Sequence, residues 1–244
     1  MSLDLLGLVP LTAISAPAIG LPALWYARAP GGIALLAAHI LWFLVVVALA
    51  ASGALAWGLK FGAPLLGLSI VTSIVVVVVL ATVVPATSRA LAAIPLPALI
   101  GVHAIRIVGF LFLLLLATGR LSAPFATSAG WGDIIAGATA VPVAWALSAR
   151  GASARWLALV WNSVGLLDLL AAITLGMTSA PGSPLQLFFD PPGSTAMATL
   201  PWAIIPVFLV PQLIVSHLAI YRRLGRSADS LWHTGSVAKA AGMA

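Results

Sequence analysis

The residue with the greatest potential for chemistry is Arg106, a cation inside an apolar stretch that runs from about residue 95 to residue 118. A charged side chain near the centre of a membrane helix costs at least about 2.5–3.5 kcal/mol, so it requires a partner or a water-filled cavity. Asp168 is the partner that the sequence predicts. Counted from the same side of the membrane, the two residues lie within about one helical turn of the same depth. We interpret the pair as lining a ligand or proton path; the alternative is a buried bridge that only fixes helix packing.

Three histidines form a second candidate group. His39, His103 and His217 belong to three different apolar stretches, and all three are expected in the cytoplasmic third of the membrane. Imidazoles at one depth can bind a haem or a metal ion, or can relay protons. Because His103 and Arg106 are three residues apart, they share a face of one helix. The alternative interpretation is that each histidine is an ordinary hydrogen-bonded or interfacial residue.

Asn162, Gln212 and Asp133 complete the predicted ligand-binding set with Arg106 and Asp168. Asn162 and Gln212 lie at inner and central depth, although they reach one spot only if prolines bend the last span. Asp133 is expected in the first turn of its helix, where a carboxylate complements the helix dipole. The functional alternative places Asp133 opposite Arg120 at an outer binding mouth.

Small residues in the same helix predict a close contact with a neighbour. Gly132, Ala136 and Ala140 recur every four residues, and Gly137 shares a face with Asp133. Small residues at this spacing allow two membrane helices to approach closely.

The composition defines the class of protein. Of the 244 residues, 62% are hydrophobic and 7% are charged, and the mean hydropathy is +1.18. A soluble domain carries about 25% charged residues, so the apolar stretches here must face lipid. We therefore expect an all-α integral membrane protein, a bundle of seven transmembrane helices. The expected spans are residues 5–26, 32–57, 64–84, 95–118, 129–148, 156–178 and 200–221.

The basic residues predict the orientation. Eight of the eleven fall on one face of the seven-span arrangement, which is expected to be cytoplasmic because Lys and Arg resist translocation. The N-terminus is then outside, residues 1–223 form the membrane domain, and residues 224–244 form a disordered cytoplasmic tail. Abundant Ala, Gly and Arg with little Lys favours a bacterial inner (plasma) membrane. The eight residues are Arg28, Arg89, Arg150, Arg155, Arg222, Arg223, Arg226 and Lys239.

Several chemistries are excluded within this chain. It has no cysteine, which removes disulfides, thiolate catalysis and iron–sulfur ligation. The net charge is +6, but the basic residues are scattered singly over the loops. Their distribution therefore indicates membrane topology and not a nucleic-acid-binding surface. No lysine lies in the last span, so a retinal Schiff base is excluded, and no phosphate-binding glycine loop is present.

Three function classes remain, and none assigns a reaction. The first, which we prefer, is binding or transport of a small anionic or lipophilic molecule around Arg106 and Asp168. The second is a haem- or metal-dependent redox protein or enzyme that uses His39, His103 and His217. The third is a structural or assembly subunit that packs against a membrane-protein partner or a second copy of itself.

Overall fold

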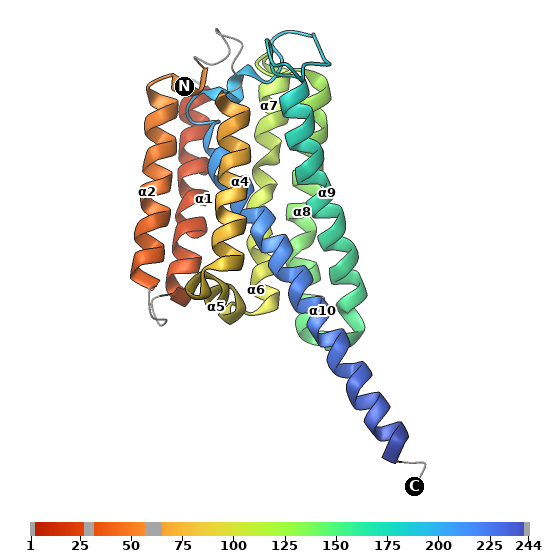
Figure 1. Ribbon diagram of the computed structural model, residues 1–244. Helices are drawn as coiled ribbons and strands as arrows, with labels where there is room; N and C mark the ends of the chain where they lie inside the picture. The colour runs from red at the N-terminus through yellow and green to blue at the C-terminus, as the bar shows by residue number, and fades with distance from the viewer. Residues whose placement is uncertain (1–2, 27–31, 57–64, 242–244) are drawn as a thin grey trace.

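The computed structural model describes residues 3–26, 32–56 and 65–241, and over these ranges it is helical without strands (Figure 1). The α-helices are α1 (Leu3–Tyr26), α2 (Gly32–Ala51), α4 (Leu65–Val83), α5 (Pro85–Ala93), α6 (Leu96–Gly101), α7 (Phe110–Ala117), α8 (Ala123–Arg150), α9 (Arg155–Thr178) and α10 (Val210–Ala241). The 3-10 helices are η1 (Val102–Gly109), η2 (Gly151–Ala154) and η3 (Thr195–Ala198), and η4 (Ile205–Leu209) is a π-helix.

Five described stretches are long and apolar enough to cross a membrane, and they indicate a multi-pass membrane protein. They are Gly32–Ala51, Leu65–Val83, Leu96–Ala117, Ala123–Thr178 and Ile205–Gly225. The fourth stretch is a pair of helices, because α8 ends at Arg150 and α9 runs back beside it (Figure 1). Gly151 has φ +54°, which is a left-handed conformation that favours glycine.

The helix bounds agree with the sequence in several places and differ in others. The β-branched run from Ile74 to Leu80 is helical within α4, as expected for a segment that must satisfy its backbone in lipid. α2 ends at Ala51, earlier than expected, because the chain turns at Gly53 with φ +73°. α8 begins six residues before the expected residue 129, since Pro124 in its first turn starts the helix.

The last helix also differs from the expectation. The chain enters it through the π-helix η4, which contains Pro206, so regular α-helix starts only at Val210. α10 then continues to Ala241, through the segment that the sequence analysis assigned to a disordered tail. In Figure 1 the end of α10 projects beyond the bundle, at the opposite end from the start of α1.

The packing distinguishes inner helices from outer ones. Within an apolar window of 18 residues in the Ile205–Gly225 stretch 72% of the residues are buried, against 11% in the corresponding windows of α2 and α4. The C-terminal helix is therefore the centre of the bundle, where α4, α6 and α9 contact it. Exposed apolar side chains such as Leu41 and Leu68 cover the outer faces of α2 and α4, which is the surface expected of helices that face lipid.

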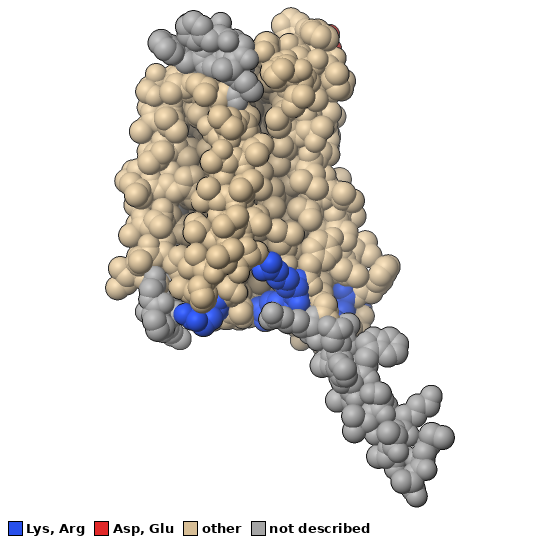
Figure 2. Space-filling model, in the orientation of Figure 1, with Lys and Arg blue, Asp and Glu red and all other residues tan. Residues whose placement is uncertain are grey.

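Five of the seven described basic side chains gather at one end of the bundle. Arg89 lies on α5, Arg150 and Arg155 flank η2, and Arg222 and Arg223 lie on α10. Figure 2 shows the basic atoms of this face at that end. Arg28, which is also expected at this end, lies outside the described residues, as do the side chains of Arg226 and Lys239.

The opposite end holds one described basic side chain in a polar contact. Arg120 Nη1 forms an ion pair with Asp4 Oδ1 at 2.7 Å, and the indole nitrogen of the buried Trp202 donates to the same oxygen at 2.8 Å. This contact joins α1 to the turn after α7 and to the segment before η4.

Candidate functional site

The site is organised by the 3-10 helix η1, which interrupts the membrane helix between α6 and α7. A 3-10 helix has three residues per turn, so residues i and i+3 are eclipsed. His103, Arg106 and Gly109 therefore lie in one line along η1, and all three are buried. In an α-helix the same residues would spiral around the axis, so the 3-10 winding is what directs them to one side.

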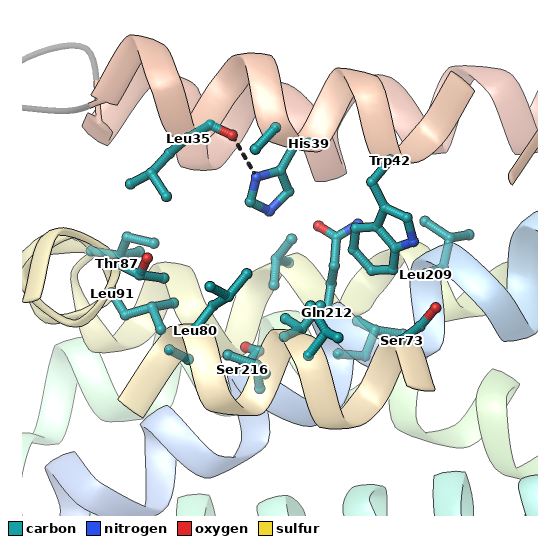
Figure 3. A pocket seen from close by; sticks show the side chains of 18 of the residues that line it. Leu35, His39, Trp42, Ser73, Leu80, Thr87, Leu91, Leu209, Gln212 and Ser216 are labelled. Carbon is teal, nitrogen blue, oxygen red and sulfur yellow. Dashed lines mark hydrogen bonds between the residues drawn. The ribbon is translucent and has the colours of Figure 1, made fainter. Parts of the chain in front are cut away.

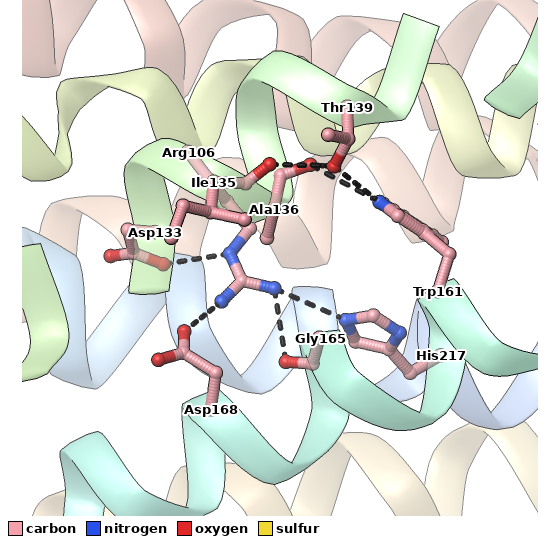
Figure 4. Close-up of polar contacts among 9 residues, drawn as sticks. All are labelled: Arg106, Asp133, Ile135, Ala136, Thr139, Trp161, Gly165, Asp168 and His217. Carbon is pink, nitrogen blue, oxygen red and sulfur yellow. Dashed lines mark hydrogen bonds and ion pairs between the residues drawn. The ribbon is translucent and has the colours of Figure 1, made fainter. Parts of the chain in front are cut away.

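Arg106 is the centre of a buried charge cluster (Figure 4). Its Nε donates to Asp133 Oδ1 at 2.7 Å, and its Nη2 forms an ion pair with Asp168 Oδ2. Its Nη1 donates to the Gly165 carbonyl oxygen at 3.0 Å and to His217 Nε2 at 3.4 Å. Only 2% of Arg106 is exposed. One cation thus faces two carboxylates, which leaves the cluster with an excess of one negative charge when both are ionised.

Glycines on α8 make this convergence sterically possible. A Cβ atom at Gly137 would lie 2.5 Å from the backbone nitrogen of Ile107, and a Cβ at Gly132 would lie within the carboxylate of Asp168. Without these side chains, η1 and α9 approach α8 closely enough for a single guanidinium to reach acids on both helices. The small-residue pattern of α8 therefore serves the cluster as well as general packing.

His217 is held in one tautomer by Asn162. Asn162 Nδ2 donates to the His217 carbonyl oxygen at 3.2 Å, so the Oδ1 of the same amide is the acceptor 2.8 Å from His217 Nδ1. Because Arg106 can only donate, His217 Nε2 must accept, and the proton of the neutral ring lies on Nδ1. The amide thus orients the imidazole toward the guanidinium.

His103 lies beside His217, and the two imidazole rings are in contact. The two ring centroids are 4.2 Å apart, and Trp161 packs against both rings. Ser216 Oγ donates to the Leu99 carbonyl oxygen at 3.2 Å, so it accepts from His103 Nε2 at 3.1 Å. His103 Nδ1 is buried and has no hydrogen-bond partner among the described residues. Ser216 thus links His103 to the Leu99 carbonyl oxygen.

Ser216 also lines a cavity of about 450 Å³, which lies between α2, α4, α5, α6, η1 and α10 (Figure 3). Most of the lining is aliphatic, and the rings of His39 and Trp42 lie on the α2 side. Val76 and Leu80 line the cavity and are 48% and 42% exposed, so the cavity is open between the outer helices. The volume is in the range of small-molecule sites in proteins.

A few polar groups interrupt the apolar wall. Thr87 is 7% exposed, and its hydroxyl has no hydrogen-bond partner among the described residues. Gln212 Nε2 donates to the Phe208 carbonyl oxygen at 3.2 Å, and its side chain extends between α10 and α2 (Figure 3). His39 Nδ1 is 2.8 Å from the Leu35 carbonyl oxygen, an acceptor, so this nitrogen carries a proton.

Most of the polar residues predicted from the sequence are in one place, but not all. The pairing of Arg106 with Asp168 is confirmed, and Asn162 joins the same network through His217. Gln212 lies in the cavity instead. Whether any of these residues contacts a ligand stays a prediction.

The expectation that Asp133 caps a helix is wrong. Because α8 begins at Ala123, Asp133 is about 15 Å along the helix, at the depth of Arg106. The alternative contact with Arg120 is also absent, since Arg120 is paired with Asp4.

The three histidines do not converge as a metal or haem site would require. His103 and His217 are adjacent, but His39 lies on α2 and lines the cavity. Both nitrogens of His217 are already engaged. Among the described residues no group of three metal-ligating side chains is close enough to hold an ion. The structure therefore corrects the grouping of His39 with the other two.

Sequence reasoning missed three participants. The Gly165 carbonyl oxygen carries no sequence signal, because any residue has one. Ser216 directly precedes the predicted site residue His217, and this position in the sequence was the one signal that could have indicated it. Thr87 lies in α5, a helix that the sequence analysis did not expect.

Comparison with known proteins places the chain in a family. A family model described as "Domain of unknown function (DUF8737)" matches residues 63–225, about two thirds of the chain. The chain belongs to this family. The DUF8737 match contains the whole charge cluster, whereas α1 and α2 lie outside it, and with them the His39 and Trp42 wall of the cavity. No curated protein and no solved structure matches the chain.

Proposed function

We propose that this DUF8737 protein binds a small lipophilic molecule, with one or two hydrogen-bonding groups, in the cavity between α2, α4, α5 and α10. The observation that carries the proposal is the cavity itself: about 450 Å³ of aliphatic wall with a buried hydroxyl, that of Thr87, without a described partner. Buried polar groups are normally hydrogen-bonded, so an unsatisfied one in an open cavity favours a bound partner.

The charge cluster argues against an anionic ligand. Arg106 donates to four different acceptors, two of them carboxylates, so its positive charge is more than neutralised where it lies. An anion brought near would meet the excess negative charge in a medium of low dielectric constant. We therefore assign Arg106, Asp133, Asp168 and Asn162 to the support of the cavity wall, to which Ser216 and His103 connect them.

The open side of the cavity supports entry from the bilayer. Val76 and Leu80 belong to α4, which shares with α2 the highest mean hydropathy of the candidate spans, 2.7, and both are exposed. A lipophilic molecule that is dissolved in the membrane meets this opening without crossing water. Binding can serve transport, sensing or delivery to a partner, and the cavity is common to all three.

The test is a matched pair of substitutions on α2. Ala38 and the neighbouring Ala37 are both exposed, but only Ala38 lines the cavity. Ala38→Phe should fill the cavity, and Ala37→Phe should add the same ring on the lipid side. Solvent extraction and mass spectrometry of protein purified in mild detergent should release a stoichiometric small molecule from wild type and Ala37→Phe but not from Ala38→Phe. Equal release from all three proteins overturns the proposal.

Thr87 gives a second test, in which one substitution should weaken ligand binding without destabilising the ligand-free protein. Thr87→Val keeps the shape but removes the unpartnered hydroxyl, so it should leave the ligand-free protein equally stable or more stable. If the hydroxyl donates to the ligand, the affinity of Thr87→Val for the extracted molecule should be about five- to tenfold weaker when that molecule is added back. This factor corresponds to about one hydrogen bond. Unchanged retention removes Thr87 from the site.

We further propose the seven-span topology, with the N-terminus outside and the basic end cytoplasmic. The gathering of Arg89, Arg150, Arg155, Arg222 and Arg223 at one end supports this orientation. The chain has no cysteine, so single cysteines report position without background. An impermeant maleimide should label Thr118→Cys in intact cells and Ala152→Cys only after permeabilisation. The reverse pattern overturns the orientation.

A further inference from the structure

A second pocket leads to the charge cluster from the end of the bundle opposite the basic residues. Its volume is about 70 Å³, and its walls come mainly from α4, α8, α9 and η4. Gly182 and Thr195 line it in the segment between α9 and η4, which lies at that end (Figure 1), and both are exposed. Phe125 and Asp133 line it on α8, eight residues apart, so the pocket follows α8 for about 12 Å. Asp133 is its inner end.

The carboxylates are the accessible part of the charge cluster. The side chain of Arg106 is 1% exposed, whereas those of Asp133 and Asp168 are 13% and 14% exposed. Arg106 occupies one oxygen of each acid, Asp133 Oδ1 and Asp168 Oδ2, and the other oxygen of Asp133 points away from the guanidinium (Figure 4). Neither second oxygen has a hydrogen bond to a described residue. Asp133 Oδ2 is therefore the polar atom available at the inner end of the pocket.

The described surroundings supply no second positive charge. The titratable groups that face Asp133 are Arg106 on η1 and Asp168 on α9, and His217 on α10 joins them through Arg106. His217 is neutral, because its Nε2 accepts from Arg106 while its one proton lies on Nδ1. The pocket walls from α4 and α7 near Asp133 are apolar, with Ile70 and Phe112. Two carboxylates therefore share one guanidinium at a depth where an unbalanced charge is costly.

A proton fits this site better than a metal ion does. Metal cations need several oxygen ligands, but the pocket has one carboxylate, and no three metal-ligating side chains of the described ranges are close together. A proton needs one lone pair. A water molecule requires at least about 10–15 Å³, so the pocket has room for several. The hydroxyls of Ser194 and Thr195 line its outer part, where their oxygens can accept from water.

We propose that Asp133 and Asp168 together hold one proton at neutral pH, and that they exchange it with water at the outer end through this pocket. The proton adds to Asp133 Oδ2 or to the second oxygen of Asp168, so one carboxylate becomes a carboxyl group and the cluster becomes neutral. Two acids beside one cation share a proton in this way because they cannot both ionise without cost. The proton site is independent of the ligand in the large cavity, so neither proposal depends on the other.

Infrared spectroscopy tests the shared proton directly. In a detergent without carbonyl groups, a protonated carboxyl group of the full chain gives a C=O stretch that shifts when D₂O replaces H₂O. Wild type at neutral pH should show one such band. Asp133→Asn and Asp168→Asn should each lose it, because the remaining carboxylate is then balanced by Arg106. Asp190→Asn is the control, since Asp190 is exposed and does not line the pocket, and it should keep the band.

A pair of cysteine variants tests the route. Thr195 and Thr118 are both exposed at the same end of the bundle, but only Thr195 lines the pocket. The chain has no cysteine of its own, so Thr195→Cys and Thr118→Cys can each be labelled at one site with a bulky maleimide. After rapid transfer into D₂O, the label on Thr195→Cys should slow the shift of the band by at least about tenfold. The label on Thr118→Cys should leave the rate unchanged.

Three outcomes overturn the proposal. The first is the absence of a protonated carboxyl band in wild type at neutral pH. The second is a band that persists in Asp133→Asn or in Asp168→Asn, which would mean that the two acids do not share the proton. The third is an equal effect of the two labels on the exchange rate, which would mean that the proton does not pass through the pocket.

Discussion

Removal of the Arg106 charge tests the charge cluster most directly. Arg106→Gln keeps a hydrogen-bonding side chain but leaves Asp133 and Asp168 facing each other without a cation. Removing one partner of a buried pair costs about 3–5 kcal/mol. This corresponds to a loss of roughly 10²- to 5 × 10³-fold in the ratio of folded to unfolded protein. We expect Arg106→Gln to accumulate poorly in membranes.

The structure predicts which second changes restore the protein. Arg106→Gln with Asp168→Asn should recover only in part, because the Asp133 carboxylate keeps an intramembrane cost of about 2.5–3.5 kcal/mol. Adding Asp133→Asn removes the last formal charge and should recover most of the wild-type level. The single change Asp168→Asn should be milder than Arg106→Gln, since Arg106 and Asp133 still balance.

The assay is the level of folded protein together with its melting temperature in detergent. Nine tryptophans give an intrinsic fluorescence signal, and the absence of cysteine rules out thiol-reactive dyes. The expected order is wild type, triple variant, double variant, Arg106→Gln. If the double variant equals the triple variant, Asp133 is not part of the ionic cluster. If Arg106→Gln melts like wild type, the reasoning from buried charge fails.

Two further predictions concern packing and use the same melting assay. Gly137→Ala places a Cβ 2.5 Å from the Ile107 backbone nitrogen and should cost about 1–3 kcal/mol, whereas Gly101→Ala meets nothing within 4 Å and should be neutral or stabilising. Equal melting temperatures for the two variants would contradict the close contact of η1 with α8. Asp4→Leu leaves the buried Trp202 indole N–H without its acceptor and should cost about 1–3 kcal/mol, whereas Asp4→Asn keeps an acceptor oxygen and should cost less. A similar loss in both variants would mean that the exposed ion pair and not the indole bond matters.

The sequence predicts the helical class and one ionic partner for a physical reason. Lipid requires each span to satisfy its own backbone, so apolar length gives the helices, and a common depth scale relates residues on different spans. That scale pairs Arg106 with Asp168 without knowledge of helix order. The depth scale fails for Asp133, because the predicted start of α8 was six residues too late. The prediction therefore put this carboxylate at the membrane surface, whereas it lies at mid-membrane.

Other features have no local signal. No pattern in the residues from Val102 to Gly109 marks the 3-10 helix that the structure has there. The cavity forms because α2 and α5 flank α10. The spacing of apolar residues along one helix does not predict such contacts between distant segments. His39 illustrates this: its depth matches the other histidines, but depth does not determine which side of a helix faces which neighbour.

The tight winding of η1 has an effect at the far end of the molecule. Eight residues rise about 16 Å as a 3-10 helix but only about 12 Å as an α-helix, so everything after Gly109 stands about 4 Å higher than uniform winding would put it. The turn that carries Arg120 is displaced in this way, and so is its ion pair with Asp4. The length of η1, which carries Arg106, thus sets the position of the Arg120–Asp4 ion pair. A change that unwinds η1 should therefore weaken this ion pair.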